Sequence, residues 1–469
     1  MGVFAAQRRR GVTRTITVER APPAIKSWTL KLEVRHIHLL TDTTMPQHLP
    51  PEIEEIIIDH FHNDPKTLKQ CSLVSRSWAA CAQKHLFNEV DFMRGSGYKM
   101  LKLWKKSFPD LSNSPACHTK LLSIEYKTST AVKNLGFIGS FTNVTHLEVD
   151  ADDCCYGPRS NVWHNLLPAV TSLCVYFSTV KLSQLFGLVY SFPSVKDLVI
   201  EGISIVYDGG HFPPSTLPEF TGTLVLDCQL KDITWTLLYL PPGSLRFRRI
   251  VWKIDSSHDK DKVKHMKNLM EKCSDTLEYI DFTYCMGGES HPFGSCDGFS
   301  TQRGFPLALD PTMTPLDLSK ATKLKGVAFR LDREHMKWFT ESLKTIPSEK
   351  KGFEEVLIRF AGHWDDPKSR EVGGERNQQC KDFENALVRL SELGGVRTRA
   401  VWHSADEWRG EERMRNLFPE MMKRGKMESI YLGVAPSKWR PVVEERCLRL
   451  RRYNKFWERD RNPVDDRIF

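Results

Sequence analysis

The sequence predicts an α/β protein in which three N-terminal helices precede an irregular solenoid with parallel strands. Two observations lead to this prediction. Residues 46–92 carry helix-start and helix-stop signals around short apolar runs. Residues 115–436 carry a short apolar pattern that recurs at intervals of about 25 residues, with candidate helices between the copies.

The first helix is expected to begin at Leu49-Pro50-Pro51, because proline suits the first turn of a helix and little else inside one. Ile53, Ile56, Ile57 and Phe61 then follow at i, i+3, i+4 and i+8. This spacing predicts one apolar stripe along the helix.

The second helix is expected to start at Asp64, with the aspartate as N-cap and Pro65 in the first helical position. It contributes Leu68 to the apolar surface. Ser72 or Ser75 is expected to cap a third helix. The apolar positions of that helix are Trp78, Cys81, Ala82, His85 and Leu86.

Residues 46–92 resemble an F-box, and in particular the expanded F-box families of mushroom-forming fungi. The shared elements occur in order: Leu49-Pro50, Glu52-Ile53, Ile56/Ile57, Leu68, Val74-Ser75-Arg76-Ser77-Trp78, and Leu86-Phe87 with Val90. The residues alone also allow an ordinary helical hairpin that caps a larger domain.

The resemblance implies a non-catalytic substrate receptor of a Skp–cullin–F-box (SCF) ubiquitin ligase, with a Skp-type adaptor, a cullin and an unidentified protein substrate as partners. By the same resemblance, the adaptor-binding positions are Leu49, Pro50, Ile53, Ile57, Leu68, Val74 and Trp78. The alternative is a repeat-based interaction scaffold without a ligase role.

The recurring apolar pattern has the form φ-x-x-φ-x-φ, where φ is apolar. A repeat of roughly 20–29 residues built on this pattern is typical of leucine-rich repeats, although these copies lack the usual Asn. A βαβ-rich domain without solenoid curvature is the alternative. The copies are Leu121/Ile124/Tyr126, Val144/Leu147/Val149, Val170/Leu173/Val175, Val195/Leu198/Ile200, the partial Leu224/Leu226, Phe247/Ile250/Trp252, Leu277/Ile280/Phe282, Leu324/Val327/Phe329, Phe353/Val356/Ile358 and Met427/Ile430/Leu432. Helices between copies are expected at 161–167, 182–190, 262–273 and 334–343.

One residue of each predicted strand should point away from the core, and most of these residues are uncharged. Exposed contiguous apolar surface marks a binding site. The prediction is therefore a substrate-docking surface; the alternative is that helices cover both sheet faces. The predicted column is Glu125, Glu148, Cys174, Val199, Val225, Val251, Asp281, Ala328, Leu357 and Tyr431. The residues assigned to substrate binding are Val199, Val225, Val251, Leu357 and Tyr431.

The net charge of +9 comes mainly from the two ends of the chain, so it says little about the body. Residues 1–44 are interpreted as a disordered basic extension or a misplaced start, with a transit peptide as the alternative. Residues 437–469 are interpreted as a basic helix or tail, with single-stranded nucleic acid binding as the less favoured alternative. Residues 285–320 and 361–380 are predicted to be surface loops.

The motifs of common enzyme and metal sites are absent from the sequence. The twelve cysteines include no C-x-x-C and no zinc-finger spacing, and no P-loop, dinucleotide-binding or hydrolase motif occurs. No apolar run approaches 18 residues. The sequence therefore predicts no catalytic residue, metal, cofactor or membrane partner, and an intracellular location in the cytoplasm, the nucleus or both.

Overall fold

A computed structural model describes sixteen stretches of the chain, and the structural statements below concern only these. They are residues 49–93, 97–110, 114–125, 135–150, 163, 165–206, 218–227, 237, 240–241, 243–254, 260–284, 314–331, 336–360, 375–392, 396–402 and 414–431. The chain divides into two compact units, Met1–Pro50 and Pro51–Phe469. The predicted extension 1–44 and tail 437–469 lie outside the described residues.

Three short helices open the second unit: α1 (Pro51–His60), α2 (Pro65–Cys71) and α3 (Arg76–Leu86). A side chain caps each of the last two. The Asp64 carboxylate accepts hydrogen bonds from the backbone N–H of Lys66 (3.0 Å) and Thr67 (3.2 Å). The Ser75 hydroxyl accepts one from the N–H of Trp78 (3.2 Å), so Ser75 and not Ser72 starts α3. These caps satisfy amide groups that the first helical turn leaves unpaired.

The three helices enclose a small core of their own. Its buried members are Ile58, Leu68, Cys71 and Ala82, and Phe61, Trp78, Cys81 and Leu86 pack against them. The inner side of α1 therefore runs through Glu54, Ile58 and Phe61. Two residues of the predicted stripe, Ile53 and Ile56, are exposed, whereas Phe61 packs against the small core. The helix has two apolar sides, and the more regular one faces solvent.

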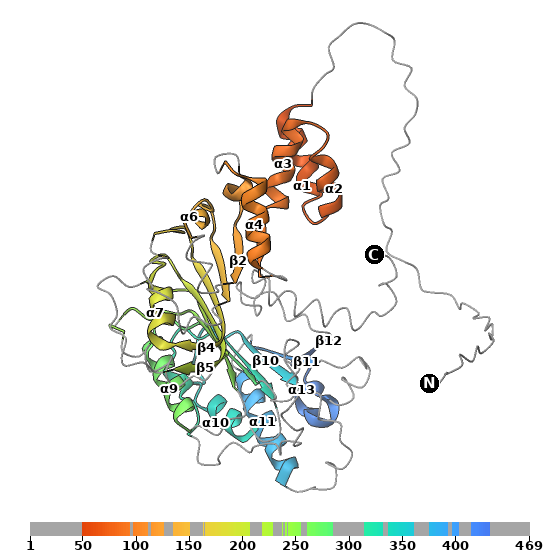
Figure 1. Ribbon diagram of the computed structural model, residues 1–469. Helices are drawn as coiled ribbons and strands as arrows, with labels where there is room; N and C mark the ends of the chain where they lie inside the picture. Colours follow the sequence, from red (N-terminus) through yellow and green to blue (C-terminus); the bar gives the residue numbers. More distant parts are fainter. Residues whose placement is uncertain are drawn as a thin grey trace, which may run out of the picture. The chain divides into compact units, whose positions relative to one another are not determined.

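A single sheet of twelve strands forms the rest of the described fold, and its strand order is the order of the chain (Figure 1). Every neighbouring pair is parallel. A parallel sheet in chain order is the arrangement that stacked repeats produce. The strands are β1 (Glu89–Phe92), β2 (Leu121–Glu125), β3 (His146–Asp150), β4 (Ser172–Lys181), β5 (Asp197–Val206), β6 (Thr223–Asp227), β7 (Arg249–Ile254), β8 (Tyr279–Tyr284), β9 (Gly326–Leu331), β10 (Glu355–Phe360), β11 (Arg397–Trp402) and β12 (Met427–Tyr431).

Helices connect many of the strands, and the sequence located three of them well. The predictions 182–190, 262–273 and 334–343 correspond to α7, α9 and α10. In the described part of 161–167 the chain turns instead, with Asn165 at φ 63°. The connecting elements are α4 (Gly97–Ser107), η2 (Pro115–His118), α6 (Leu135–Ile138), α7 (Leu182–Tyr190), α9 (Lys260–Lys272), η6 (Leu318–Lys320), α10 (Met336–Lys344), α11 (Glu375–Ser391) and α13 (Pro419–Lys423).

One face of the sheet, here called the helix-side face, packs with these helices into a single large core. From β3 to β10, register aligns one apolar residue of each strand along this face, and each is fully buried. The aligned residues are Leu147, Leu173, Leu198, Leu224, Ile250, Ile280, Val327 and Val356. Aromatic rings extend the stack, with the Phe282 and Phe329 centroids 5.8 Å apart.

Backbone hydrogen bonds carry the register one residue beyond the strands. The carbonyl of Lys120 accepts from the N–H groups of Thr145 (2.9 Å) and His146 (3.0 Å). The carbonyl of Arg248 accepts in the same way from Glu278 (2.7 Å) and Tyr279 (3.0 Å). Because the arrangement recurs from repeat to repeat, adjacent strands cannot slip without breaking a row of paired groups.

The register corrects the first and last predicted copies. Leu122, and not the predicted Ile124, aligns with Leu147. At the other end Met427, and not the predicted Ile430, aligns through Thr398 with Val356. Two strands were missed: β1, which lies inside the segment 46–92 and before the predicted repeat start at 115, and β11. Strand β11 escaped because Thr398 and Ala400 occupy its core positions, which weakens the apolar pattern.

The predicted loops meet the described residues only at their ends. Residues 361–380 were predicted to be a loop, but α11 begins at Glu375. Its mainly polar first turns concealed a helix that buries Phe383 and Leu387 further on. Residues 314–320 of the other predicted loop end in η6, where Asp317 caps the N–H of Ser319 (3.2 Å).

Candidate interaction surfaces

Large exposed apolar side chains are concentrated at the start of the described chain. Five of the eight lie between residues 49 and 74, and two more lie on α4. Such residues are unremarkable singly, but a cluster marks an interaction site. The eight are Leu49 (47% exposed), Ile53 (42%), Ile56 (64%), Leu73 (86%), Val74 (65%), Met100 (47%), Leu103 (56%) and Val206 (41%).

The turn between α2 and α3 holds Leu73 and Val74 outward. The N–H of Leu73 donates to the carbonyl of Gln70 (3.0 Å), and that of Val74 donates to the carbonyl of Cys71 (3.1 Å). Ser75 then caps α3. The backbone of the turn is therefore hydrogen bonded on both sides, and the two apolar side chains remain the most exposed of the eight.

Two polar contacts fix α1 against α3. Lys84 Nζ lies 2.6 Å from Glu55 Oε1, and His85 Nε2 lies 2.6 Å from Asp59 Oδ1. The hydrogen bond to Glu55 raises the pKa of Lys84 above its ordinary value. Exposed pairs add little stability. Their consequence here is positional, because they set which side of α1 faces solvent.

The seven residues assigned to adaptor binding divide by exposure. Leu49, Pro50, Ile53 and Val74 are exposed, and Ile57 and Trp78 are half-buried. Leu68 is 1% exposed and belongs to the small core. Its side chain therefore supports the helices from inside.

Sequence reasoning left two of the most exposed apolar residues out of the assigned set. Ile56 was recognised in the stripe of α1 but was not assigned to binding, and Leu73 directly precedes the assigned Val74. The i, i+3 spacing of Ile53 and Ile56 was the signal for the first. The second lies in an irregular turn, which carries no periodic signal.

The predicted substrate column is assembled as expected at its centre but is not exposed. Val199, Val225 and Val251 are direct neighbours in the register of β5, β6 and β7. Each is 1% exposed, and with Cys174 and Tyr176 they form a second small core against which Met93 packs. The prediction of an open apolar docking surface was therefore wrong at these positions.

The ends of the column also need correction. The face opposite the helix-side face is called the second face below. Leu357 aligns with Ala328 and Arg399 on it, but Leu357 is fully buried. Tyr431 aligns with Trp402. Trp402 lies two residues after Ala400, which is on the helix-side face, so the register assigns Tyr431 to that face and not to the second one. The register replaces Glu125 by Ser123 at the start and Tyr431 by Glu428 at the end. The corrected column is Ser123, Glu148, Cys174, Val199, Val225, Val251, Asp281, Ala328, Leu357, Arg399 and Glu428.

Polar residues on the second face are paired within it. The Ser123 hydroxyl donates to Glu148 (2.5 Å), and both residues are buried. Arg399 lies 3.0 Å from the fully buried Glu355. Buried polar groups are tolerated when they are hydrogen bonded or paired with an opposite charge. At the described central positions both faces of the sheet are therefore buried.

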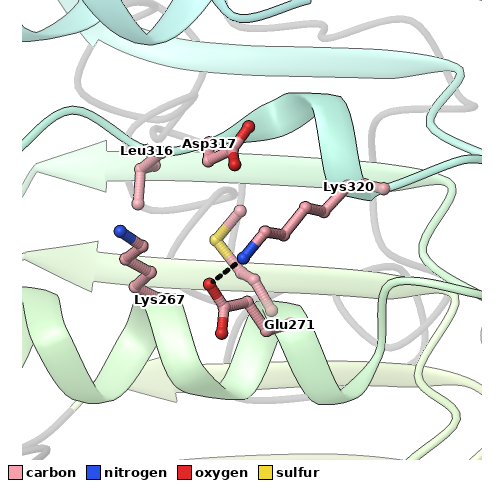
Figure 2. Close-up of a pocket in the computed structure, with 7 residues that line it drawn as sticks. Lys267, Glu271, Leu316, Asp317 and Lys320 are labelled. Carbon is pink, nitrogen blue, oxygen red and sulfur yellow. Dashed lines mark hydrogen bonds and ion pairs between the residues drawn. The ribbon is translucent and has the colours of Figure 1, made fainter.

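A small depression lies between α9 and the η6 turn (Figure 2). Lys267, Met270 and Glu271 line one side, and residues 316–321 line the other. Lys320 crosses it to reach Glu271 at 2.9 Å. The remaining room is on the order of one water molecule, too little for an organic ligand.

Two further searches of the described residues found neither a metal centre nor a membrane segment. No group of three or more His, Cys, Asp or Glu side chains could hold a metal ion there. Within the same residues, no helix is long and apolar enough to cross a bilayer.

No protein-family model matches this chain, and no curated protein matches it.

Proposed function

We propose that this chain is the substrate-recognition subunit of an SCF-type ubiquitin ligase and that α1–α3 bind a Skp-type adaptor. The observation that carries the proposal is the exposure of four apolar side chains of α1 and the α2–α3 turn, Ile53, Ile56, Leu73 and Val74, which follow Leu49 in the chain and are 42–86% exposed. The F-box-like pattern includes Leu49, Ile53, Ile56 and Val74 in order, and Leu73 directly precedes Val74.

The energetics favour a partner for this surface. Fully burying an aliphatic side chain contributes about 1.5–3 kcal/mol relative to leaving it in water. The small core of α1–α3 already uses Ile58 and Leu68, and the exposed set is a second collection of similar side chains. Apolar anchors of this kind dominate the free energy of protein–protein association.

The sheet would supply the rigid body that such a receptor needs. A receptor of this class carries no catalytic residue, metal or cofactor, because it acts by holding a substrate near a separate ubiquitin-conjugating enzyme. A fully packed array of parallel strands suits that role, since it transmits position without bending. The cullin would be reached through the adaptor.

The test is co-expression of the full chain with a Skp-type adaptor, followed by size-exclusion chromatography. The test variant is Ile53→Gln/Ile56→Gln. The matched control is Met100→Gln/Leu103→Gln, which also replaces two exposed apolar residues on one helix. The native chain and the control should co-elute with the adaptor, whereas the test variant should elute alone with an unchanged circular dichroism spectrum.

Two results would contradict the proposal. One is a folded native chain that elutes apart from the adaptor. The other is co-elution that the Ile53→Gln/Ile56→Gln change leaves intact. Either result would leave a repeat-based interaction scaffold as the better interpretation.

A further inference from the structure

Helix α4 (Gly97–Ser107) is firmly attached to the sheet by one of its sides. Leu101 is 7% exposed and belongs to the large core, against which Trp104 also packs. The Trp104 ring lies 5.8 Å from that of Phe92 on β1 and 5.6 Å from that of Phe141. The helix is therefore a fixed platform, and its other side has a defined orientation.

The other side carries three lysines and two apolar residues. Lys99, Lys102 and Lys106 recur at i, i+3 and i+7 and are exposed. Met100 is 47% and Leu103 is 56% exposed beside them. These five residues are called the α4 face below. The remaining lysine of the helix, Lys105, lies over the Phe137 ring at 5.3 Å and is not part of it.

Within the described part of the chain, no acidic residue pairs with the lysines of the α4 face. Helix α4 contains no acidic residue. No ion pair joins Lys99, Lys102 or Lys106 to a carboxylate among the residues that the structure describes. By contrast, exposed cations of several other helices are paired. Examples are Lys84 with Glu55, Lys344 with Glu341 and Arg424 with Glu392.

We propose that the α4 face docks an acidic amphipathic helix of a partner protein. Lysines one and two turns apart form a row, and a second helix lying along that row would place carboxylates at the same spacing. Met100 and Leu103 are one turn apart, so they offer two adjacent apolar anchors to apolar residues of that helix. Such a contact combines charge complementarity with burial of apolar side chains. The charges set the orientation of the partner helix.

The composition of the face favours a protein helix over a lipid surface. Helices that lie on membranes bury a broad apolar side, commonly with Trp or Phe. Here Trp104 packs against the core, and Met100 and Leu103 are the exposed large apolar residues among the described side chains of the helix. This docking site is separate from the adaptor surface and does not rest on the proposed function.

The probe is a fluorescein-labelled synthetic peptide helix with Glu at i, i+3 and i+7 and Leu at i+1 and i+4, titrated with the full chain by fluorescence anisotropy. Two variants test the face: Lys99→Glu/Lys102→Glu/Lys106→Glu and Met100→Gln/Leu103→Gln. Each should weaken binding about tenfold or more. Higher salt should also weaken binding of the native chain, because exposed charges are screened.

Two controls separate this site from general charge and from the adaptor surface. Lys323→Glu/Lys351→Glu/Lys426→Glu makes the same charge change at three exposed lysines elsewhere. Ile53→Gln/Ile56→Gln removes the exposed residues of α1. Both should bind the peptide as the native chain does. Adaptor co-elution and peptide binding can therefore fail independently.

Four results would overturn the proposal. They are no binding of the helical peptide by the native chain, equal binding of a peptide with the same composition but scrambled spacing, and equal loss in the lysine control. The fourth is α4-dependent binding to vesicles of phosphatidylserine and phosphatidylcholine without peptide binding, which would identify an anionic membrane as the occupant. Thermal melts of each variant establish that it is folded.

Discussion

The helical segment α1–α3 and the twelve-stranded sheet treat their apolar residues in opposite ways. At the centre of both sheet faces, from Leu147 on β3 to Leu357 on β10, the aligned valines, leucines and isoleucines are at most 1% exposed. In the segment 49–86, four hydrophobic residues are fully enclosed while five large ones are exposed. A region that buries its apolar surface needs nothing further, whereas a region that keeps such surface in water retains it for contact. The difference supports the proposal that the sheet provides stability and the helices provide recognition.

The largest effect on stability is expected from a cavity in the large core of the sheet. Phe282 is 1% exposed, stacks on Phe329 and meets the edge of Trp338. Replacing it with alanine should lower the free energy of unfolding by about 3–5 kcal/mol, because it removes both burial and ring contacts. Urea unfolding followed by fluorescence measures this change. A loss well below 2 kcal/mol would show that the core relaxes around the cavity and is looser than described.

A smaller, local effect is expected in the small core. Ile58→Ala should cost about 2–5 kcal/mol within α1–α3, since Ile58 is fully buried there. Hydrogen exchange should speed up in α1, α2 and α3 while the strands keep their protection. Equal loss of protection in β4–β8 would contradict the separation of the two cores.

The sheet should also show a specific acid sensitivity. Burial acts to raise the pKa of Glu278, but hydrogen bonds from Lys325 and Arg248 outweigh it and hold that pKa below its ordinary 4.5. A carboxylate with a lowered pKa stabilises the fold above its unfolded pKa and loses that contribution as pH falls through the folded value. Glu278→Gln should therefore be less stable than the native chain at pH 7.

The pH dependence of that deficit tests its origin. The difference between the native chain and Glu278→Gln should shrink as pH falls below 4.5, because protonation removes the advantage of the native carboxylate. Melting temperatures from pH 3 to pH 7 provide the measurement. A constant difference across this range would mean that the side chain acts by packing alone.

The smallest effect on stability is expected where the effect on recognition is greatest. Ile53→Gln/Ile56→Gln replaces side chains that are already 42% and 64% exposed, so the free energy of unfolding should change by less than about 0.5 kcal/mol. Denaturation of the free chain checks this. A loss comparable to that of Ile58→Ala would show that the exposed side of α1 belongs to the core after all.

Much of the sheet could be predicted because its helix-side face follows a rigid rule. Leu173, Leu198 and Ile250 recur with β-alternation, and this pattern located most strands. The segment between two copies of the pattern located α7. The pattern missed β11, because the polar Thr398 occupies a position that is apolar in the other copies. It also could not reveal that Val225 is covered, because alternation distinguishes the two faces of a strand but does not say what covers each.

The helical segment was predictable in outline but not in orientation. The caps Asp64 and Ser75 are local signals and could be identified from the residues alone. Which side of α1 faces inward depends on how α2 and α3 pack against it. Ile53, Ile56 and Ile57 formed the more regular stripe, yet Ile58 is the residue at the centre of the core.

Calorimetric titration of the native full chain with a Skp-type adaptor at several temperatures tests the central claim most directly. Burial of the exposed apolar side chains of α1–α3 predicts binding with a negative heat-capacity change. Binding should disappear in Ile53→Gln/Ile56→Gln and persist in Met100→Gln/Leu103→Gln. Absence of binding by the folded native chain, or binding that the first variant leaves unchanged, would contradict the assignment of recognition to the helices.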